Sequence, residues 1–257
     1  MTITAVIITR DEERNIDRCL QSLEGVADEV VVVDSGSTDR TEQICQGHGV
    51  RFVRHEWEGY AAQKNYANGL ATCQWILSID ADEALSPQLR NSILALKRQE
   101  TQAPGPSDSR TVRVYAFNRL TNYCGHWVRH CGWYPDRCTR LFPAGTACWD
   151  GLIHEQLDFN APATTSHLDG DLHHYSYYTV AEHLSRMVKY APLSAEKAYQ
   201  EGKRCGALAV VLRPAWTFVR GYILKGGFLD GTTGFVICRL SATYTLVKYA
   251  TLRHLCQ

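Results

Sequence analysis

The sequence predicts an α/β fold: a mostly parallel central sheet with helices on both faces, followed by a helical, basic C-terminal region. Three observations support this prediction. Short apolar runs rich in Val and Ile alternate with helical periodicity over residues 1–100. Two of these runs end abruptly in aspartate, and the last part of the chain is helical and rich in Lys and Arg. Alternating strands and helices of this length form parallel sheets with right-handed crossovers.

Each strand predicted in the first half of the chain is followed by a predicted helix. After the first strand, Ile16, Leu20 and Leu23 recur at helical spacing. After the second strand, Asp39 with Glu42 three residues later is typical of a helix N-terminus. The predicted strands are residues 3–9, 29–33, 50–54 and 75–79, and the third and fourth helices are residues 60–70 and 86–99.

Beyond residues 102–110, a loop rich in Pro, Gly and Ser, the pattern changes. Residues 111–117 alternate as a strand, and residues 118–158 are dense in Trp, Tyr, Cys, Gly and Arg without a helical period, a composition expected to shape a pocket. Residues 179–201 again read as a helix. We therefore expect a domain of residues 1–178, with halves at 1–100 and 111–178, and a C-terminal helical region of residues 179–257.

The net charge of zero conceals an uneven distribution. Residues 203–257 carry eight Lys or Arg and one Asp, a charge of +7, so the remainder carries −7. Nucleic acid is disfavoured as a partner because the tail contains apolar runs such as residues 207–212 and the body of the protein is acidic. No uncharged apolar run in the tail reaches about 18 residues, so we expect it not to span a bilayer, although it could lie on one.

The cysteines predict a reducing compartment. The chain has ten Cys and no Cys-x-x-Cys pair, and it begins with a strand pattern in place of a charged segment and apolar core. These features predict reduced thiols in a cytosolic protein, without a disulfide framework or a zinc site.

The fourth predicted strand ends in a cluster of acidic residues. Asp80, Asp82 and Glu83 follow its apolar run and precede a helix that begins at Pro87. Ligands of open α/β sheets lie beyond the carboxyl ends of the strands. Two carboxylates one residue apart can both turn toward one hard divalent cation whose other ligands are phosphate oxygens and water. The alternative is that Asp82 and Glu83 only favour the N-terminus of the helix.

Two other positions suggest a nucleotide. Asp34 ends the second strand, where a carboxylate can accept hydrogen bonds from a nucleobase or ribose, and Gly36 lets the backbone approach a ligand closely. Lys64 lies between two amides near the start of the third helix and could pair with a diphosphate. The structural alternatives are a capped turn at Asp34 and a solvated lysine at Lys64.

The ordered set of these motifs resembles the inverting family 2 glycosyltransferases with the GT-A fold. The motifs are DSGSTD at residues 34–39, QKN at 63–65 and LSIDADE at 77–83. Further segments resemble the branch that adds a sugar to the lipopolysaccharide inner core, the β-1,4-glucosyltransferase type. These are CGWYPDR at residues 131–137, RLF at 140–142, IHE at 153–155, HYS at 174–176 and GFLDG at 227–231.

The resemblance implies roles for the matching residues. Asp34 matches the position that holds uracil, and Asp80 and Asp82 match the Asp-x-Asp that binds metal and diphosphate. His174 matches a C-terminal histidine that completes the metal or diphosphate site. The expected metal ligands are Asp80, Asp82 and His174, and the residues expected to bind the nucleotide sugar are Thr9, Glu12, Asp34, Ser35, Gly36, Lys64, Asp80 and Ala81.

The implied reaction needs a general base. Inversion in one displacement requires a group that takes the proton of the acceptor hydroxyl on the face opposite the leaving nucleoside diphosphate. Glu155 matches the acidic position that serves as this base. The family motif is often Glu-Asp, whereas this chain has His154, Glu155 and Gln156, so Asp136 stays open as a rival base.

The resemblance implies a divalent cation, Mg²⁺ or Mn²⁺, and a nucleotide-sugar donor, with UDP-glucose expected. The implied acceptor is a lipid-linked anionic saccharide such as lipopolysaccharide core heptose, and the implied location is cytoplasmic, peripherally bound to the inner face of the cytoplasmic membrane. Aromatic and Arg side chains at residues 127–140 suit sugar rings and phosphates.

Two alternatives stay open, and a third is disfavoured. The same family could use another donor or acceptor, polyprenyl phosphate or a polysaccharide, and a non-catalytic membrane-surface module is possible. A nucleotidyltransferase is disfavoured because residues 9–13, after the first strand, are acidic and lack glycine.

Overall fold

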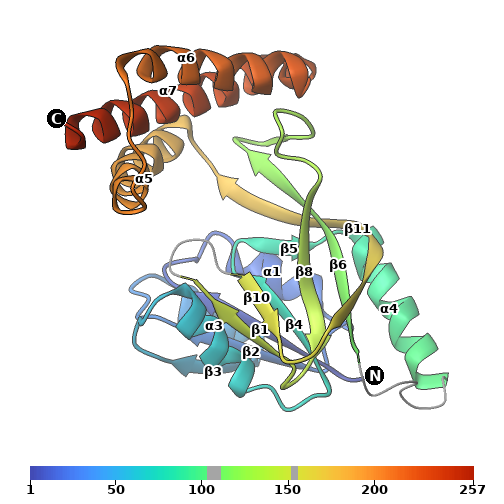
Figure 1. Ribbon diagram of the computed structural model, residues 1–257. Helices are drawn as coiled ribbons and strands as arrows, with labels where there is room; N and C mark the ends of the chain where they lie inside the picture. The colour runs from blue at the N-terminus through green and yellow to red at the C-terminus, as the bar shows by residue number, and fades with distance from the viewer. Residues whose placement is uncertain (103–110, 152–155) are drawn as a thin grey trace. The chain divides into compact units, whose positions relative to one another are not determined.

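The computed structural model of the protein describes residues 1–102, 111–151 and 156–257, with side chains except those of residues 101 and 102 (Figure 1). It contains two compact units. Unit 1 comprises Met1–Arg119 and Asp136–His174, and unit 2 comprises Leu120–Pro135 and Tyr175–Gln257. The segment from Leu120 to Pro135, which the sequence assigns to the first domain, thus shares a unit with the C-terminal helices.

The main sheet has nine strands, of which four neighbours in space are parallel. These are β3 (Arg51–Arg54), β2 (Glu29–Asp34), β1 (Ile3–Thr9) and β4 (Trp75–Asp80). Thr9 lies opposite Asp34, and Ile8 lies opposite Asp80. The carboxyl ends of β1, β2 and β4 are therefore level, and the predicted parallel arrangement brings their polar ends to one edge.

The rest of the main sheet is antiparallel. In spatial order after β4 come β8 (Asp136–Pro143), β6 (Val112–Tyr123), β11 (Ala163–Tyr177) and the short β5 (Glu83–Leu85), and β7 (His126–Trp127) pairs with β6. Leu77 of β4 lies opposite Leu141 of β8, and Glu83 lies opposite His174 of β11. Strands β8 and β11 thus bring residues of the second half of the chain to the end of β4. A separate pair of strands is formed by β9 (Ala147–Asp150) and β10 (Gln156–Phe159).

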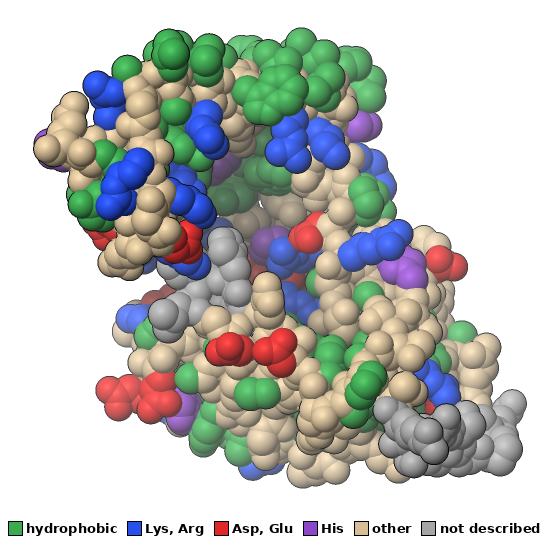
Figure 2. All heavy atoms as spheres, in the orientation of Figure 1, with side chains coloured by type: hydrophobic (Ala, Val, Ile, Leu, Met, Phe, Trp, Pro, Cys, Tyr) green, Lys and Arg blue, Asp and Glu red, His purple; other side chains and the backbone are tan. Residues whose placement is uncertain are grey.

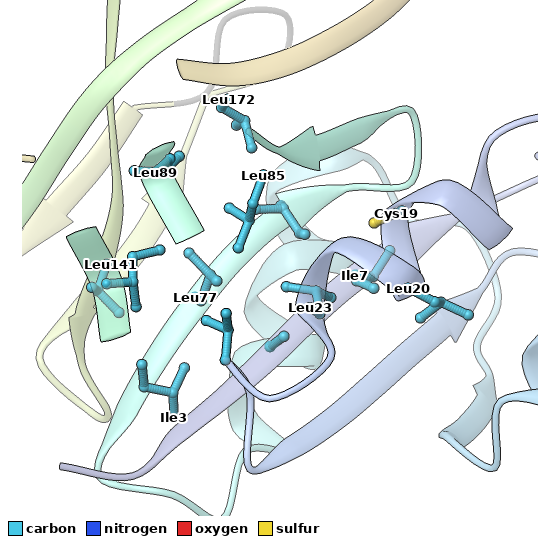
Figure 3. Packing of buried hydrophobic residues seen from close by; sticks show 14 of the residues in the cluster. Ile3, Ile7, Cys19, Leu20, Leu23, Leu77, Leu85, Leu89, Leu141 and Leu172 are labelled. Carbon is cyan, nitrogen blue, oxygen red and sulfur yellow. The ribbon is translucent and has the colours of Figure 1, made fainter. Parts of the chain in front are cut away.

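Helices cover both faces of the parallel strands, as the sequence predicts. They are α1 (Ile16–Leu23), α2 (Thr41–Gly47), α3 (Tyr60–Gly69) and α4 (Pro87–Gln102). Side chains alternate between the faces of a strand. Ile7 of β1 therefore packs in a cluster with Leu23 of α1 and residues of α4, whereas its neighbour Val6 packs with Ala67 of α3. Figure 3 shows the first of these clusters, in which Leu, Ile and Cys side chains from strands and helices meet.

Unit 2 contains the C-terminal helices. These are α5 (Val180–Gln200), α6 (Ala207–Val219), the π-helical turn η1 (Arg220–Leu224), the 3-10 turn η2 (Gly227–Asp230) and α7 (Gly231–Leu255). A capping box starts α5: the Glu182 N–H donates to Thr179 Oγ1, and the Glu182 carboxylate accepts from the Thr179 N–H. The helix predicted over residues 179–201 is confirmed.

The turn between η2 and α7 is held by a buried carboxylate and a close backbone contact. Asp230 accepts hydrogen bonds from the backbone N–H groups of Arg129 and His130, at 3.4 and 2.8 Å. Burial by itself raises the pKa of Asp230, but its hydrogen bonds to His130 and Arg129 lower that pKa below the ordinary value. Gly234 packs so tightly that an added β-carbon would lie 1.9 Å from the Gly227 carbonyl oxygen. The Gly-Phe-Leu-Asp-Gly segment is therefore a packing element within unit 2.

Helix α6 and the turn after it form an exposed apolar stretch. Ala207–Leu224 is 18 residues long, has a mean hydropathy of 1.3, and none of it is buried; by length and composition it is, among the described residues, the one helical stretch that could cross a membrane. A search of the sequence for uncharged apolar runs does not find this stretch, because it contains Arg213 and Arg220. Figure 2 shows hydrophobic side chains gathered over α6.

Candidate active site

Asp80 lies between two buried cations at the end of β4. The Lys64 Nζ atom is 3.0 Å from Asp80 Oδ1, and the Arg140 Nη2 atom is 3.2 Å from Asp80 Oδ2. Lys64 and Arg140 are only 5% and 4% exposed. Burial by itself raises the pKa of Asp80, but the charges of Lys64 and Arg140 outweigh it and hold that pKa well below the ordinary value. Asp80 is therefore an ionised anchor for two cations.

Glu83 stabilises the end of β4 through a hydrogen bond and two ion pairs. It is 1% exposed, and its Oε2 atom accepts a 2.9 Å hydrogen bond from the Asp80 backbone N–H. Its Oε1 atom lies 3.3 Å from Arg140 and 3.4 Å from Arg119. Helix α4 is capped instead by Ser86, which accepts the Leu89 N–H. Glu83 thus stabilises the Asp-Ala-Asp turn, and the alternative that it favours the start of the helix is wrong.

Asp82 pairs with His174, which β11 supplies. The His174 Nε2 atom lies 3.2 Å from Asp82 Oδ2, and both side chains are partly exposed. Burial by itself lowers the pKa of His174, but the charge of Asp82 outweighs it and raises that pKa. Within residues 1–102, 111–151 and 156–257, no three His, Cys, Asp or Glu side chains converge as a metal site. Of the three predicted ligands, Asp82 and His174 therefore lie together, and Asp80 is paired with Lys64 and Arg140.

Carboxylate and imidazole are a suitable pair of ligands for Mn²⁺, which accepts both oxygen and nitrogen donors. The Asp82 and His174 side chains present one of each at the carboxyl end of the sheet. Phosphate oxygens of a nucleotide could complete such a site. The residues present thus fit a divalent cation held jointly by protein and ligand.

Of the two candidate bases, the structure describes only Asp136. Asp136, on β8, accepts from Arg119 Nε at 2.8 Å, and Arg119 Nη2 lies 2.7 Å from the same carboxylate oxygen. Glu155 lies outside the described residues, between Asp150 and Gln156 of the β9–β10 pair.

Asp34 forms the capped turn that is the structural alternative to its predicted contact with a nucleotide. Its carboxylate accepts the backbone N–H groups of Gly36 and Ser37, each at 2.9 Å, and also the Ser37 hydroxyl. Gly36 has φ +88°, a left-handed conformation that suits glycine. The turn therefore orients the loop after β2, and Asp34 itself is 1% exposed.

A hollow of about 470 Å³ opens beside this turn. It is lined by Asp34, Ser35, Gly36, Arg54, His55, Glu56 and Trp57. The ring of His55 stacks on Tyr66 at 3.8 Å, and its Nδ1 atom lies 2.9 Å from Gln63 Oε1. A hollow of this size with aromatic walls at the end of β2 suits a planar heterocycle.

The remaining predicted binding residues have mixed positions. Thr9 presents a buried hydroxyl that has no hydrogen-bond partner among the described residues, and its carbonyl accepts the Ser35 N–H. Glu12 accepts from Asn15 Nδ2 at 2.7 Å. Ala81 packs in the hydrophobic core, so only its backbone is placed to meet a ligand.

Sequence reasoning missed Arg119 and Trp149, and it gave Arg140 only as part of residues 127–140, for the sugar rings and phosphates of an acceptor. Arg119 and Arg140 come from antiparallel strands, and Trp149 comes from β9. The Arg140 signal was available, since it heads the Arg-Leu-Phe segment of the resemblance. No pattern in the sequence singled out Trp149.

The chain is similar to a known family of enzymes. Residues 4–138 match the family model described as "Glycosyl transferase family 2". A relative from Rickettsia bellii, named "Uncharacterized glycosyltransferase", is 29% identical over 98% of this chain and 86% of its own length. The lipopolysaccharide core biosynthesis glycosyltransferase LpsC of Rhizobium meliloti is 29% identical over 97% of this chain and 91% of its own length.

Solved structures are more distantly similar. Staphylococcus aureus TarS is 13% identical over 96% of this chain and 55% of its own, with a TM-score of 0.47. A glucosyl-3-phosphoglycerate synthase from Mycobacterium tuberculosis, in complex with Mn²⁺, UDP and glucosyl-3-phosphoglycerate, is 19% identical over 47% of this chain and 44% of its own, with a TM-score of 0.36.

Proposed function

Because this chain belongs to glycosyl transferase family 2, we propose that it is an inverting, metal-dependent transferase that moves glucose from UDP to a lipid-linked anionic saccharide. The observation that carries the proposal is the cluster at the end of β4. There Lys64 and Arg140 flank Asp80, and Asp82 pairs with His174. The hollow beside Asp34 lies at the end of β2, on the same edge of the sheet.

The nucleoside of the donor would occupy the hollow at the end of β2. Its walls include the aromatic rings of His55 and Trp57, and a uracil ring can stack on such surfaces. The buried Thr9 hydroxyl and the backbone around Gly36 would provide polar contacts. Lys64 lies on α3 beside Asp80, and its neighbour Gln63 contacts His55 of the hollow, so a cation there would favour the diphosphate.

The charge of the cluster supports a metal requirement. It contains four carboxylates and three permanently basic groups before His174 is counted: Asp80, Asp82, Glu83 and Asp136 against Lys64, Arg119 and Arg140. A diphosphate adds further negative charge, which this set cannot balance. A divalent cation held by Asp82 and His174 would supply the missing charge and act as a Lewis acid toward the leaving diphosphate.

Glu155 would be the general base. It would take the proton of the acceptor hydroxyl while Lys64 and Arg140 stabilise the charge that develops on the leaving group. The lone pairs of one Asp136 oxygen are already engaged by Arg119, which favours Glu155 over its rival.

The acceptor would be a saccharide of the lipopolysaccharide core, met at the inner face of the cytoplasmic membrane. The LpsC relative, which the chain matches over nearly its whole length, supports this class of acceptor. The exposed apolar face of α6, with Arg213 and Arg220 in the same stretch, would hold the protein at an anionic lipid surface.

The test is calorimetric titration with UDP, with and without Mn²⁺. We expect wild-type protein to bind UDP only with the metal. Asp82→Asn should weaken that binding at least about tenfold, because it removes a charged ligand. Asp158→Asn, which removes an exposed carboxylate on β10, is the matched control and should bind as wild type.

Three results would contradict the proposal. Metal-independent binding, or equal binding by Asp82→Asn, would remove the metal from the site. Absence of UDP binding by folded wild-type protein would point to another nucleotide donor or to a lipid-phosphate sugar, and both can be titrated in the same way.

A further inference from the structure

The indole ring of Trp149 covers the two cations that flank Asp80. The Lys64 Nζ atom lies 4.8 Å from the ring centroid, and the Arg140 Cζ atom lies 5.6 Å from it. Both distances are within the range of cation–π attraction, which is strongest for Trp and for desolvated cations. Trp149 is itself buried, at 7% exposure. One aromatic ring thus lies within cation–π distance of both charges that hold Asp80.

Asn65 fixes the position of this ring. Its Nδ2 atom donates to the Trp149 carbonyl at 2.8 Å, and its Oδ1 atom accepts the Trp149 backbone N–H at 2.8 Å. The Asn65 side chain therefore satisfies both backbone groups of one residue of β9. Since Asn65 follows Lys64 directly on α3, one helical turn sets both the cation and the ring above it.

We propose that Trp149 is a positioning residue, whose indole ring holds Lys64 and Arg140 in place beside Asp80 and keeps water from them. The inference rests on the proposed function, because the two cations matter through the diphosphate they would stabilise. Fixed charges in a water-poor site act more strongly on a developing charge than solvated ones. Loss of the ring would let both cations become solvated and weaken their action on the diphosphate.

A space-filling role makes a different prediction. If Trp149 only fills the core, a side chain of similar apolar character would replace it at a cost in stability alone. If its π face is needed, Phe should substitute well and Leu poorly, although both are apolar and smaller than Trp. The measurement must therefore distinguish the binding of the diphosphate from the binding of the nucleoside.

The experiment compares UDP with uridine on Trp149→Leu and Trp149→Phe, with Mn²⁺ present. We expect Trp149→Leu to bind UDP about tenfold more weakly, as the loss of one or two desolvated cation–π contacts implies, and to bind uridine as wild type does. Trp149→Phe should restore most of the UDP affinity. The UDP affinity of Trp149→Leu should also fall more steeply with salt, because solvated charges are screened more than buried ones.

A second pair of variants tests the hydrogen bonds of Asn65 to Trp149 and controls for misfolding. Asn65→Ala releases the ring without changing it, and should lower the ratio of UDP to uridine affinity in the same direction as Trp149→Leu. Asn68→Ala is the matched control: it removes an equal amide from the same helix, one with no hydrogen-bond partner among the described residues. It should leave the ratio unchanged.

Equal UDP-to-uridine ratios in wild type, Trp149→Leu and Trp149→Phe would overturn the proposal. If wild-type protein binds no UDP, the proposed function fails, and the contact itself is then measured by urea unfolding of Lys64→Met, Trp149→Leu and the double variant. Non-additive losses of stability would support the Lys64–Trp149 contact, and additive losses would refute it.

Discussion

Asp80 and Asp82 are two residues apart but have different surroundings. Asp80 meets two buried permanent cations, whereas Asp82 pairs with the imidazole of His174. Removing the charge of Asp80 would leave Lys64 buried without this counter-ion and Arg140 with Glu83 alone; breaking a buried ion pair costs a protein about 3–5 kcal/mol. Asp82 is therefore the residue at which a change in metal binding can be separated from a loss of stability.

The base assignment gives a test at single residues. Glu155→Gln should leave UDP binding nearly unchanged and lower the transfer rate by about 10²–10⁴-fold, because general-base catalysis contributes that much. The rate is measured with saturating donor, and UDP affinity is measured in parallel by calorimetry. Asp136→Asn should have a smaller effect, through the freed Arg119.

The variant Asp158→Asn, at an exposed position of β10, serves again as the control for a lost negative charge. A large rate loss in Asp136→Asn together with a nearly normal Glu155→Gln enzyme would reverse the assignment. Equal losses in both would mean that Asp136 positions the acceptor or Arg119, and the acceptor KM would then rise as well.

Helix α7 depends on a glycine inside it. A β-carbon at Gly234 would lie 1.9 Å from the Gly227 carbonyl oxygen and 3.0 Å from the Asp230 β-carbon. Gly234→Ala should therefore destabilise unit 2 by about 3 kcal/mol, the upper end of overpacking costs, although Ala is the better helix former. Chemical unfolding followed by circular dichroism measures the loss.

Gly69→Ala provides the matched control at this scale. Gly69 ends α3, its backbone is not left-handed, and an added β-carbon there would meet nothing within 4 Å. We expect that variant to be neutral or slightly stabilised. Equal stability of Gly234→Ala and wild type would show that η2 can move away from α7, contrary to the close contact described here.

Pairing between distant strands assembles the site at the scale of elements. Arg140 reaches Asp80 because β8 runs antiparallel beside β4, and His174 reaches Asp82 because β11 pairs with β5. The sequence predicts only residues 111–117 as a strand in this half. Charged and polar residues interrupt the apolar alternation of β8 and β11, so local periodicity could not reveal them.

The exposed face of α6 bears on how the whole molecule meets its acceptor. Val211 of α6 and Val188 of α5 are both strongly exposed, at 67% and 71%. If α6 contacts lipid, Val211→Gln should lower binding to vesicles that contain anionic lipid by about tenfold, because a buried valine side chain is worth about 1.5 kcal/mol. Vesicle flotation of the full chain measures the bound fraction.

Val188→Gln is the control, since it makes the same exchange at similar exposure on another helix. It should bind vesicles as wild type does. Equal binding by both variants would mean that α6 does not contact lipid, and reduced binding by Val188→Gln alone would move the lipid-binding face to α5.

The sequence by itself determined the parallel strands, the helices on their two faces and the acidic end of β4. Each of these follows from local periodicity or from residue types at a strand end, which neighbours in the chain decide. The sequence also identified the family, because residues 34–39, 63–65 and 77–83 lie within the segment that matches the family model.

Only the tertiary structure decided what each charged residue faces. In the sequence, Glu83 has two interpretations, as a member of the acidic cluster or as a residue that favours the helix start, but in the structure it is a buried counter-ion of Arg140 and Arg119. Trp149 carries no signal of its own, yet its ring lies over Lys64 and Arg140. These contacts join residues that are far apart in the chain, and their strength depends on burial. A linear pattern records neither the distance between such residues nor the water excluded around them.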